Sequence, residues 1–298
     1  MHKNSRTTRT GFTRRPSAFL NALLLLAIVL LAAACSSGPS GNQSGPPHGP
    51  FGNSPTGVPL SVAAGAMNSV AVDKSGKVWT WGNNGIGQLG VGLTPGQSAT
   101  QLLVAGLPTI VQVAAGANHV VALADDGTVW AWGSDASGQI GPNGTHDPLQ
   151  PQRTPVKVDG VTGAKAVAAA GDQSLALLND GTVMAWGLNA NGELGQGTFS
   201  AGSSTPTLVP GLTDVIDVAA GGTRAGGHVL ALSATGAVWT WGRNTSGELA
   251  YDNLVYPARA TPSQVPGITS ATEVAAGGSF SLSLLDDGSV LAWGANSV

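Results

Sequence analysis

Residues 113–141 read VAAGANHVVALADDGTVWAWGSDASGQIG, and close variants of this stretch occur five times in the chain of 298 residues. The copies begin at Val62, Val113, Val167, Val218 and Val274. Each holds a Trp-Gly pair, whose tryptophans lie 51, 54, 55 and 52 residues apart: Trp81, Trp132, Trp186, Trp241 and Trp293. Self-similarity at a nearly fixed period of this length predicts a propeller or an array of repeats rather than independent folds.

Each copy combines strand-forming runs with turn signals. A Val-Ala-Ala-Gly type run comes first, and we expect its glycine where no side chain fits or where φ is positive. In the second copy, Asp126-Gly127 between apolar runs predicts a hairpin turn, because Gly accepts positive φ and Asp tolerates it. The return strand ends at Trp-Gly. The glycines of the first runs are Gly65, Gly116, Gly171, Gly221 and Gly277.

Segments of variable length separate the copies. They contain proline and a β-rich stretch, so we expect each to supply the remaining strand of a blade and a connecting loop. Their bounds are 91–112, 142–166, 196–217 and 251–273.

The fourth copy is four residues longer than the first between its first glycine and its Trp-Gly pair. The extra residues lie in Thr223–Gly227, at a strand turn. We interpret this insertion as a protruding loop that carries Arg224 and His228 and forms a candidate recognition feature. Neutral drift in loop length is the alternative.

The repeated pattern VAAG-x-x-x-S-L-A-L-x-x-D-G-x-V-x-x-W-G-x-N-x-x-G-Q-L-G resembles the repeat of the regulator of chromosome condensation family, over roughly residues 59–298. The resemblance implies an all-β propeller of antiparallel four-stranded blades, usually seven. Residues 58–298 span only about 4.6 periods, so we expect about five recognisable blades. A truncated chain is the favoured explanation; an unusual five-bladed ring and a ring completed by a second chain are the alternatives.

The N-terminal 57 residues differ from the repeats. Residues 1–34 are a basic segment followed by an apolar run and small residues, which predicts a secretory signal peptide. Ala32-Ala33-Ala34-Cys35 resembles the lipobox of bacterial lipoproteins, which implies that Cys35 is lipidated; secretion with a free cysteine is the alternative. Residues 35–57 are then a Ser/Gly/Pro-rich tether whose flexible part reaches roughly 25 Å.

Charge and composition exclude several classes of partner. The formal charge is −3, from 13 basic and 16 acidic residues. Five of the basic residues and none of the acidic ones fall in residues 1–34, so the remainder has eight basic and 16 acidic residues, a charge of −8. Nucleic-acid binding needs clustered Lys and Arg, so we expect no nucleic-acid partner. Cys35 is the single cysteine, which excludes a disulfide framework and a cysteine metal site.

The sequence offers no unique catalytic constellation. His119 and His228 stand at one repeat position, and Ser69, Ser174 and Ser281 stand nearby in the other copies, so a scaffold role is favoured over nucleophilic catalysis. We expect no enzyme activity, no metal and no cofactor. The tryptophans are favoured as core anchors over sugar-stacking platforms.

We therefore expect a non-catalytic binding module, lipid-anchored to a bacterial cell membrane, that presents loops outside the cytoplasm to a protein partner. The founder of the resembled family acts on a small GTPase at chromatin. We expect neither a small GTPase nor DNA as a partner of an exported acidic chain. Another branch of the fold, in bacteria, is an exported inhibitor of β-lactamase, and its compartment is closer to the one expected for this chain. The alternative is a carbohydrate or cell-wall binding domain that uses the loop aromatics Tyr251, Tyr256 and Phe199. An enzyme or an enzyme inhibitor ranks lower.

Overall fold

The computed structural model describes residues 61–92, 96–147 and 149–296, and every regular element in these ranges is a β-strand. The first strand of each sheet is β1 (Ser61–Ala64), β5 (Ile110–Ala115), β9 (Ala164–Ala170), β13 (Val215–Thr223) or β17 (Ala271–Ala276). The second is β2 (Asn68–Val72), β6 (His119–Ala124), β10 (Gln173–Leu178), β14 (Gly226–Ser233) or β18 (Phe280–Leu285).

The Trp-Gly pairs lie at the ends of the third strands or one residue before them, and the variable segments supply the fourth strands. The third strands are β3 (Val78–Asn83), β7 (Val129–Gly133), β11 (Val183–Leu188), β15 (Val238–Arg243) and β19 (Val290–Gly294). The fourth strands are β4 (Gln97–Leu103), β8 (Gln152–Lys157), β12 (Gly202–Leu208) and β16 (Ala258–Gln264).

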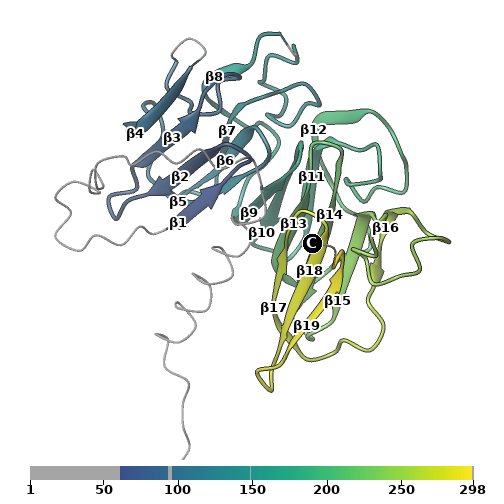
Figure 1. The fold of residues 1–298 in the computed structure, drawn as a ribbon. Helices are drawn as coiled ribbons and strands as arrows, with labels where there is room; N and C mark the ends of the chain where they lie inside the picture. The colour runs from purple at the N-terminus through teal and green to yellow at the C-terminus, as the bar shows by residue number, and fades with distance from the viewer. Residues whose placement is uncertain (1–60, 93–95, 148, 297–298) are drawn as a thin grey trace, which may run out of the picture.

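Within the described residues the strands form four four-stranded sheets and one three-stranded sheet, each an antiparallel meander in chain order. We call them blades 1 to 5. Figure 1 shows the blades following one another from purple to yellow, and the first strands of successive blades contact one another. The expectation of an all-β chain of four-stranded repeats is confirmed, and the variable segments do supply the outermost strands.

The core lies between the blades rather than within one of them. Four apolar clusters each join two consecutive blades. Trp132, Trp186 and Trp241 are fully buried in three of these clusters, and Trp293 packs partly buried against the fourth. Each indole N–H crosses to the blade before it: the acceptors are the carbonyl oxygens of Gln88, Gln139, Glu193 and Glu248. Trp81 of blade 1 is only partly buried.

The glycine after each of these tryptophans bends the third strand. Gly187 has φ 102°, a conformation that L side chains rarely adopt. The register with the fourth strand shifts at this point, between Ala185 and Gly187, and the equivalent shift occurs in blades 1, 2 and 4. The Trp-Gly pair is therefore a bulge that turns the indole toward the neighbouring blade.

The glycines that follow the first strands mark a close approach of backbones. A Cβ on Gly221 would collide with the Gly277 carbonyl of the next blade, and one on Gly65 would lie 2.7 Å from the Gly116 carbonyl. Of the five, Gly171 has positive φ, at 51°. Backbone bonds cross between blades here, as from Ala117 N to Gly171 O at 2.7 Å. Steric exclusion is therefore the main reason for glycine at these positions.

Candidate functional site

The meander gives the molecule two unlike faces. The first strand of each blade runs toward what we call the loop face, which holds the connections between first and second strands and between third and fourth strands. The opposite turn face holds the short hairpins between second and third strands and the connections to the next blade. Ser61 pairs with Val72, directly before the hairpin at Asp73, so β1 begins at the turn face.

Positive charge is divided between the faces by residue type. All four arginines of the described residues lie at the loop face: Arg153, Arg224, Arg243 and Arg259. All four lysines of these ranges lie at the turn face: Lys74, Lys77, Lys157 and Lys165.

Negative charge is divided as well. The hairpins and connections of the turn face carry eight aspartates: Asp73, Asp125, Asp126, Asp159, Asp180, Asp214, Asp286 and Asp287. Most carboxylates of the loop face are buried: Asp135, Asp172, Glu193 and Glu248. At the same face, Asp147 is half-buried and Asp252 is exposed.

Exposed apolar side chains gather in the connections of the loop face. Those in its loops are Met67, Leu149, Phe199, Leu254, Val255 and Tyr256. The other large exposed apolar residues among the described ranges lie within strands: Leu103, Val111, Leu208, Ile216, Val290 and Leu291.

The loops that display these residues are held by the Asn or Asp three positions after each Trp. Asn244 Oδ1 accepts from Leu249 N at 2.9 Å, and its Nδ2 donates to the carbonyls of Tyr251 and Tyr256. Asn84, Asp135 and Asn189 accept the same backbone bond five residues on. One repeated residue therefore fixes the common turn and, in the later blades, the variable loop.

Tyr251 and Tyr256 lie together with Arg259, which no motif of the sequence marks. The Arg259 guanidinium lies 4.1 Å from the centroid of the Tyr251 ring and 4.3 Å from that of Tyr256. The Tyr251 hydroxyl donates to the Gln264 carbonyl. One face of each ring is therefore covered by a cation of the same chain.

Arg224 is exposed at the loop face, as expected, but its hairpin is not free. The insertion lengthens β13 and β14, and Arg224-Ala225 forms the turn between them. When the Asn118 side-chain amide of blade 2 is oriented so that both its nitrogen and its oxygen are hydrogen-bonded, its oxygen accepts from Arg224 Nε at 3.3 Å. Burial raises the pKa of Asp172 in blade 3, and the charge of Arg224 opposes this shift.

The expectation that His228 lies on the protruding loop is wrong. His228 is fully buried in β14, opposite Gly242 of β15, because the insertion extends the strands and does not displace it from them. Its Nε2 lies 3.0 Å from Ser281 Oγ of blade 5, and His119 pairs in the same way with Ser174 of blade 3, at 2.9 Å. Both histidines join consecutive blades.

The pattern of repeats and sheets agrees with a known family model, described as the RCC1-like domain, which matches residues 35–298. The chain belongs to the RCC1-like domain family. It is 30% identical over 247 residues to the ultraviolet-B receptor UVR8 of Arabidopsis thaliana, covering 80% of this chain and 53% of UVR8. This RCC1-like chain thus spans about half the length of that relative.

Two solved structures share the fold of this RCC1-like domain. Human WBSCR16 matches with a TM-score of 0.69 and 27% identity, over 78% of this chain and 62% of WBSCR16. Prp20p from Saccharomyces cerevisiae, described together with its binding properties to Gsp1p and histones, matches with a TM-score of 0.58 and 22% identity, over 78% and 71%. At that identity the likeness to Prp20p shows the fold alone.

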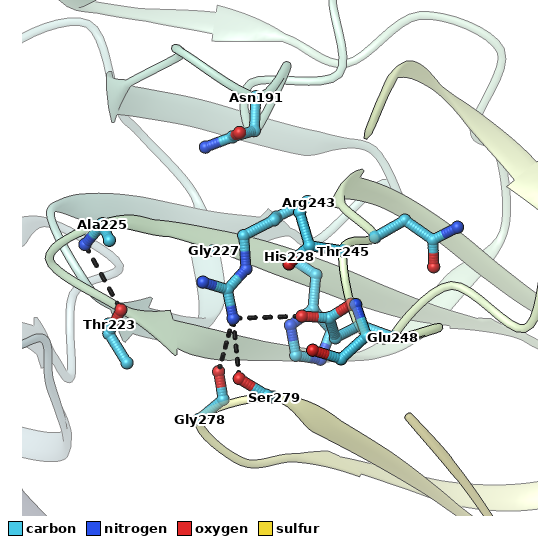
Figure 2. A network of polar contacts seen from close by, with 12 residues as sticks. Asn191, Thr223, Ala225, Gly227, His228, Arg243, Thr245, Glu248, Gly278 and Ser279 are labelled. Carbon is cyan, nitrogen blue, oxygen red and sulfur yellow. Dashed lines mark hydrogen bonds and ion pairs between the residues drawn. The ribbon is translucent and has the colours of Figure 1, made fainter. Parts of the chain in front are cut away.

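The RCC1-like domain contains a buried ion pair, Arg243 with Glu248, that was not predicted from the sequence. Figure 2 shows the Arg243 side chain between its own blade and the first turn of blade 5. Its Nη2 lies 3.0 Å from Glu248 Oε1 and 2.7 Å from Ser279 Oγ. The Glu248 side chain is fully buried and that of Arg243 is 13% exposed.

The repeats contain a signal for this pair. Blades 1 and 2 place Asn83 with Gln88, at 2.9 Å, and Ser134 with Gln139, at 3.4 Å, at the same two repeat positions. Where the second position is Glu in blade 4, the first is Arg. In blade 3 the residue at the first position is Leu188. The Glu193 carboxylate accepts instead from Asn191 and from the backbone N–H of Gly227.

Several expectations fall on parts of the RCC1-like chain that the structure does not describe. The signal peptide, Cys35 and the tether lie outside the described residues. Within the described ranges, no helix has the length and apolar character to cross a membrane. The same ranges contain no group of three or more His, Cys, Asp or Glu side chains placed to hold a metal ion. The absence of a cofactor and of enzyme activity stay predictions.

The two buried histidines should make folding sensitive to acid. Burial lowers the pKa of His119 and of His228 to about 4, below the usual 6.5. Between these values the unfolded chain takes up protons and the folded chain does not, so stability falls as pH falls from about 6.5 toward 4. We expect a loss of about 2 kcal/mol per histidine between about pH 7.5 and pH 5.

The matched comparison for this prediction is the double variant His119→Gln, His228→Gln, since blade 3 carries Gln173 at that repeat position. Asp217 acts in the opposite sense, because burial raises its pKa to about 6. Urea unfolding at several pH values should therefore show the acid loss shrinking in the double variant. An unchanged pH slope in that variant would refute the assignment.

Proposed function

We propose that this RCC1-like domain is a non-catalytic module, lipid-anchored outside the cytoplasm of a bacterium, that binds a protein partner through its loop face. The observation that carries the proposal is the division of side chains between the faces. Protein interfaces are enriched in Arg, aromatic residues and Met and depleted in Lys and Asp. The loop face holds all four described arginines and the exposed loop apolar residues, and the turn face holds the lysines and most aspartates.

The comparisons support protein binding only at the level of the family. Prp20p was described with binding to Gsp1p and histones, which are its own partners. The expectation that this chain has no small GTPase partner rests on its predicted export and stays a prediction. The stacking of Tyr251 and Tyr256 on Arg259 leaves the carbohydrate alternative without a specific supporting observation.

Site-specific photo-cross-linking in cells that produce the full chain tests the proposed binding face. A photoreactive phenylalanine analogue replaces Phe199 at the loop face or, as the matched control, Leu208 at the turn-face end of β12; these side chains are 58% and 51% exposed. We expect discrete protein adducts from position 199 and none from position 208. Equal adducts at both positions, or none at position 199, would contradict the proposal.

The proposed anchor has its own test. Metabolic labelling with a fatty-acid analogue should mark the wild-type chain and bring it into the membrane fraction. The Cys35→Ser variant should lose both the label and the membrane association. A wild-type chain without label, recovered outside the membrane fraction, would show that the chain is secreted or retained in another form.

A further inference from the structure

The outer end of blade 4 at the loop face is a preformed cluster of aromatic, cationic and apolar groups. Arg259 is stacked between Tyr251 and Tyr256, and its Nη1 donates to Ser263 Oγ at 2.6 Å. Beside this stack, Leu254 and Val255 are 90% and 60% exposed. We call residues 251–259 the blade 4 cluster.

Hydrogen bonds fix the conformation of this cluster before any partner binds. Asn244 Nδ2 donates to the carbonyls of Tyr251 and Tyr256 and so holds both ends of the loop. Inside it, Asp252 Oδ1 accepts from Leu254 N at 2.9 Å, and the Asp252 carbonyl accepts from Tyr256 N at 2.8 Å. A loop that is already ordered loses little conformational entropy on binding, which favours it as an interface anchor.

The cluster leaves two kinds of interaction unmade. Leu254 and Val255 show apolar surface to solvent, where burial by a partner would be favourable. Arg259 forms no ion pair with any carboxylate of the described residues, and its Nη1 donates to a neutral acceptor, Ser263 Oγ. An arginine that is desolvated by two rings and still has donors to offer is suited to a carboxylate.

We propose that the blade 4 cluster is the anchor point for an acidic and apolar segment of a protein partner. In this interface an aliphatic or aromatic side chain of the partner packs on Leu254 and Val255, and an Asp or Glu accepts from the free donors of Arg259. The acidic turn face repels the same segment, so charge directs it to the loop face. The inference rests on the proposed function and names the chemistry of its partner.

A phosphate backbone would also satisfy an arginine, but the structure favours a protein. The described residues carry four arginines, and one of them, Arg243, is already paired with Glu248. Nucleic-acid binding needs several cations that neutralise consecutive phosphates. The described residues carry twice as many acidic as basic side chains, 16 against eight.

The test is selection of a displayed library of random peptides on the full chain, followed by binding measurements with the synthesised winners. We expect enriched peptides that combine Asp or Glu with a large apolar residue. Leu254→Asp and Arg259→Gln should each weaken their binding roughly tenfold or more, and Arg259→Lys should weaken it less. Leu208→Asp is the matched control, because Leu208 is an exposed leucine at the opposite, turn face, with 51% exposure, and it should leave binding unchanged.

Four results would overturn the inference. They are a library without enrichment, an enriched motif that is basic or uncharged, binding insensitive to Leu254 and Arg259, and displacement of the peptides by a short labelled DNA duplex at moderate salt. Binding that maps to Leu149 or Phe199 instead would reject the blade 4 cluster while the proposed loop-face function stands. The cross-linking at position 199 decides that function separately.

Discussion

Trp186→Ala should lower the free energy of unfolding by about 3–5 kcal/mol, the range measured for removing a large buried aromatic side chain. Trp186 is fully buried among apolar residues of blades 2 and 3, and its Nε1 donates to the Gln139 carbonyl at 3.0 Å. The substitution removes apolar contact with both blades and leaves that carbonyl without its indole donor. Urea unfolding followed by circular dichroism measures the loss.

Trp186→Phe separates the two contributions. Phenylalanine keeps most of the apolar contact but cannot donate to Gln139, so we expect a loss of only about 1–2 kcal/mol. If the two variants lose the same stability, the hydrogen bond and not the packing would dominate. A loss below 1 kcal/mol for Trp186→Ala would show that the blades close over the cavity, and that the inter-blade core is not the main source of stability.

Arg243→Asn should be nearly as damaging, with a loss of about 3–5 kcal/mol, because it leaves the buried Glu248 carboxylate without its cation. Glu248 has no exposed side-chain surface, and Arg243 also binds Ser279 Oγ of blade 5. The loss should be measured by the same urea unfolding.

The repeats themselves supply the rescue for this variant. Blade 1 carries Asn83 and Gln88 at the two positions, joined by a 2.9 Å hydrogen bond. The double variant Arg243→Asn, Glu248→Gln recreates that neutral pair in blade 4, and we expect it to recover most of the lost stability. A double variant as unstable as the single one would mean that the contact with Ser279 matters more than the ion pair.

The local chemistry of the sequence predicted most of the fold. Turns such as Asp126-Gly127 form hairpins because their backbone requirements are carried by the residues themselves, and Gly127 has φ 78°. The 51- to 55-residue period predicted the succession of blades, since each unit can bury its indole only against a neighbour.

The candidate site was predicted less well, for physical reasons. His228 was placed on a loop although it stands 13 residues before Trp241, as His119 stands 13 before Trp132; counting back from the Trp-Gly pair places both in strands. Arg259 gave no local signal. Its stack depends on a loop conformation set by Asn244, 15 residues earlier, and periodicity carries no information on such a contact.

The start of β1 lies beside the Asp73 hairpin, so the segment that precedes β1 reaches the domain at the turn face. If the chain is held through Cys35, as proposed, the tether joins the domain at its acidic turn face, within roughly 25 Å of the lipid. Anionic headgroups would then repel the side nearest to them, and this repulsion weakens over about one Debye length, near 8 Å at physiological salt. The domain would then be held away from the membrane with its loop face directed outward. Rising salt would screen this repulsion and allow the domain to approach the lipid.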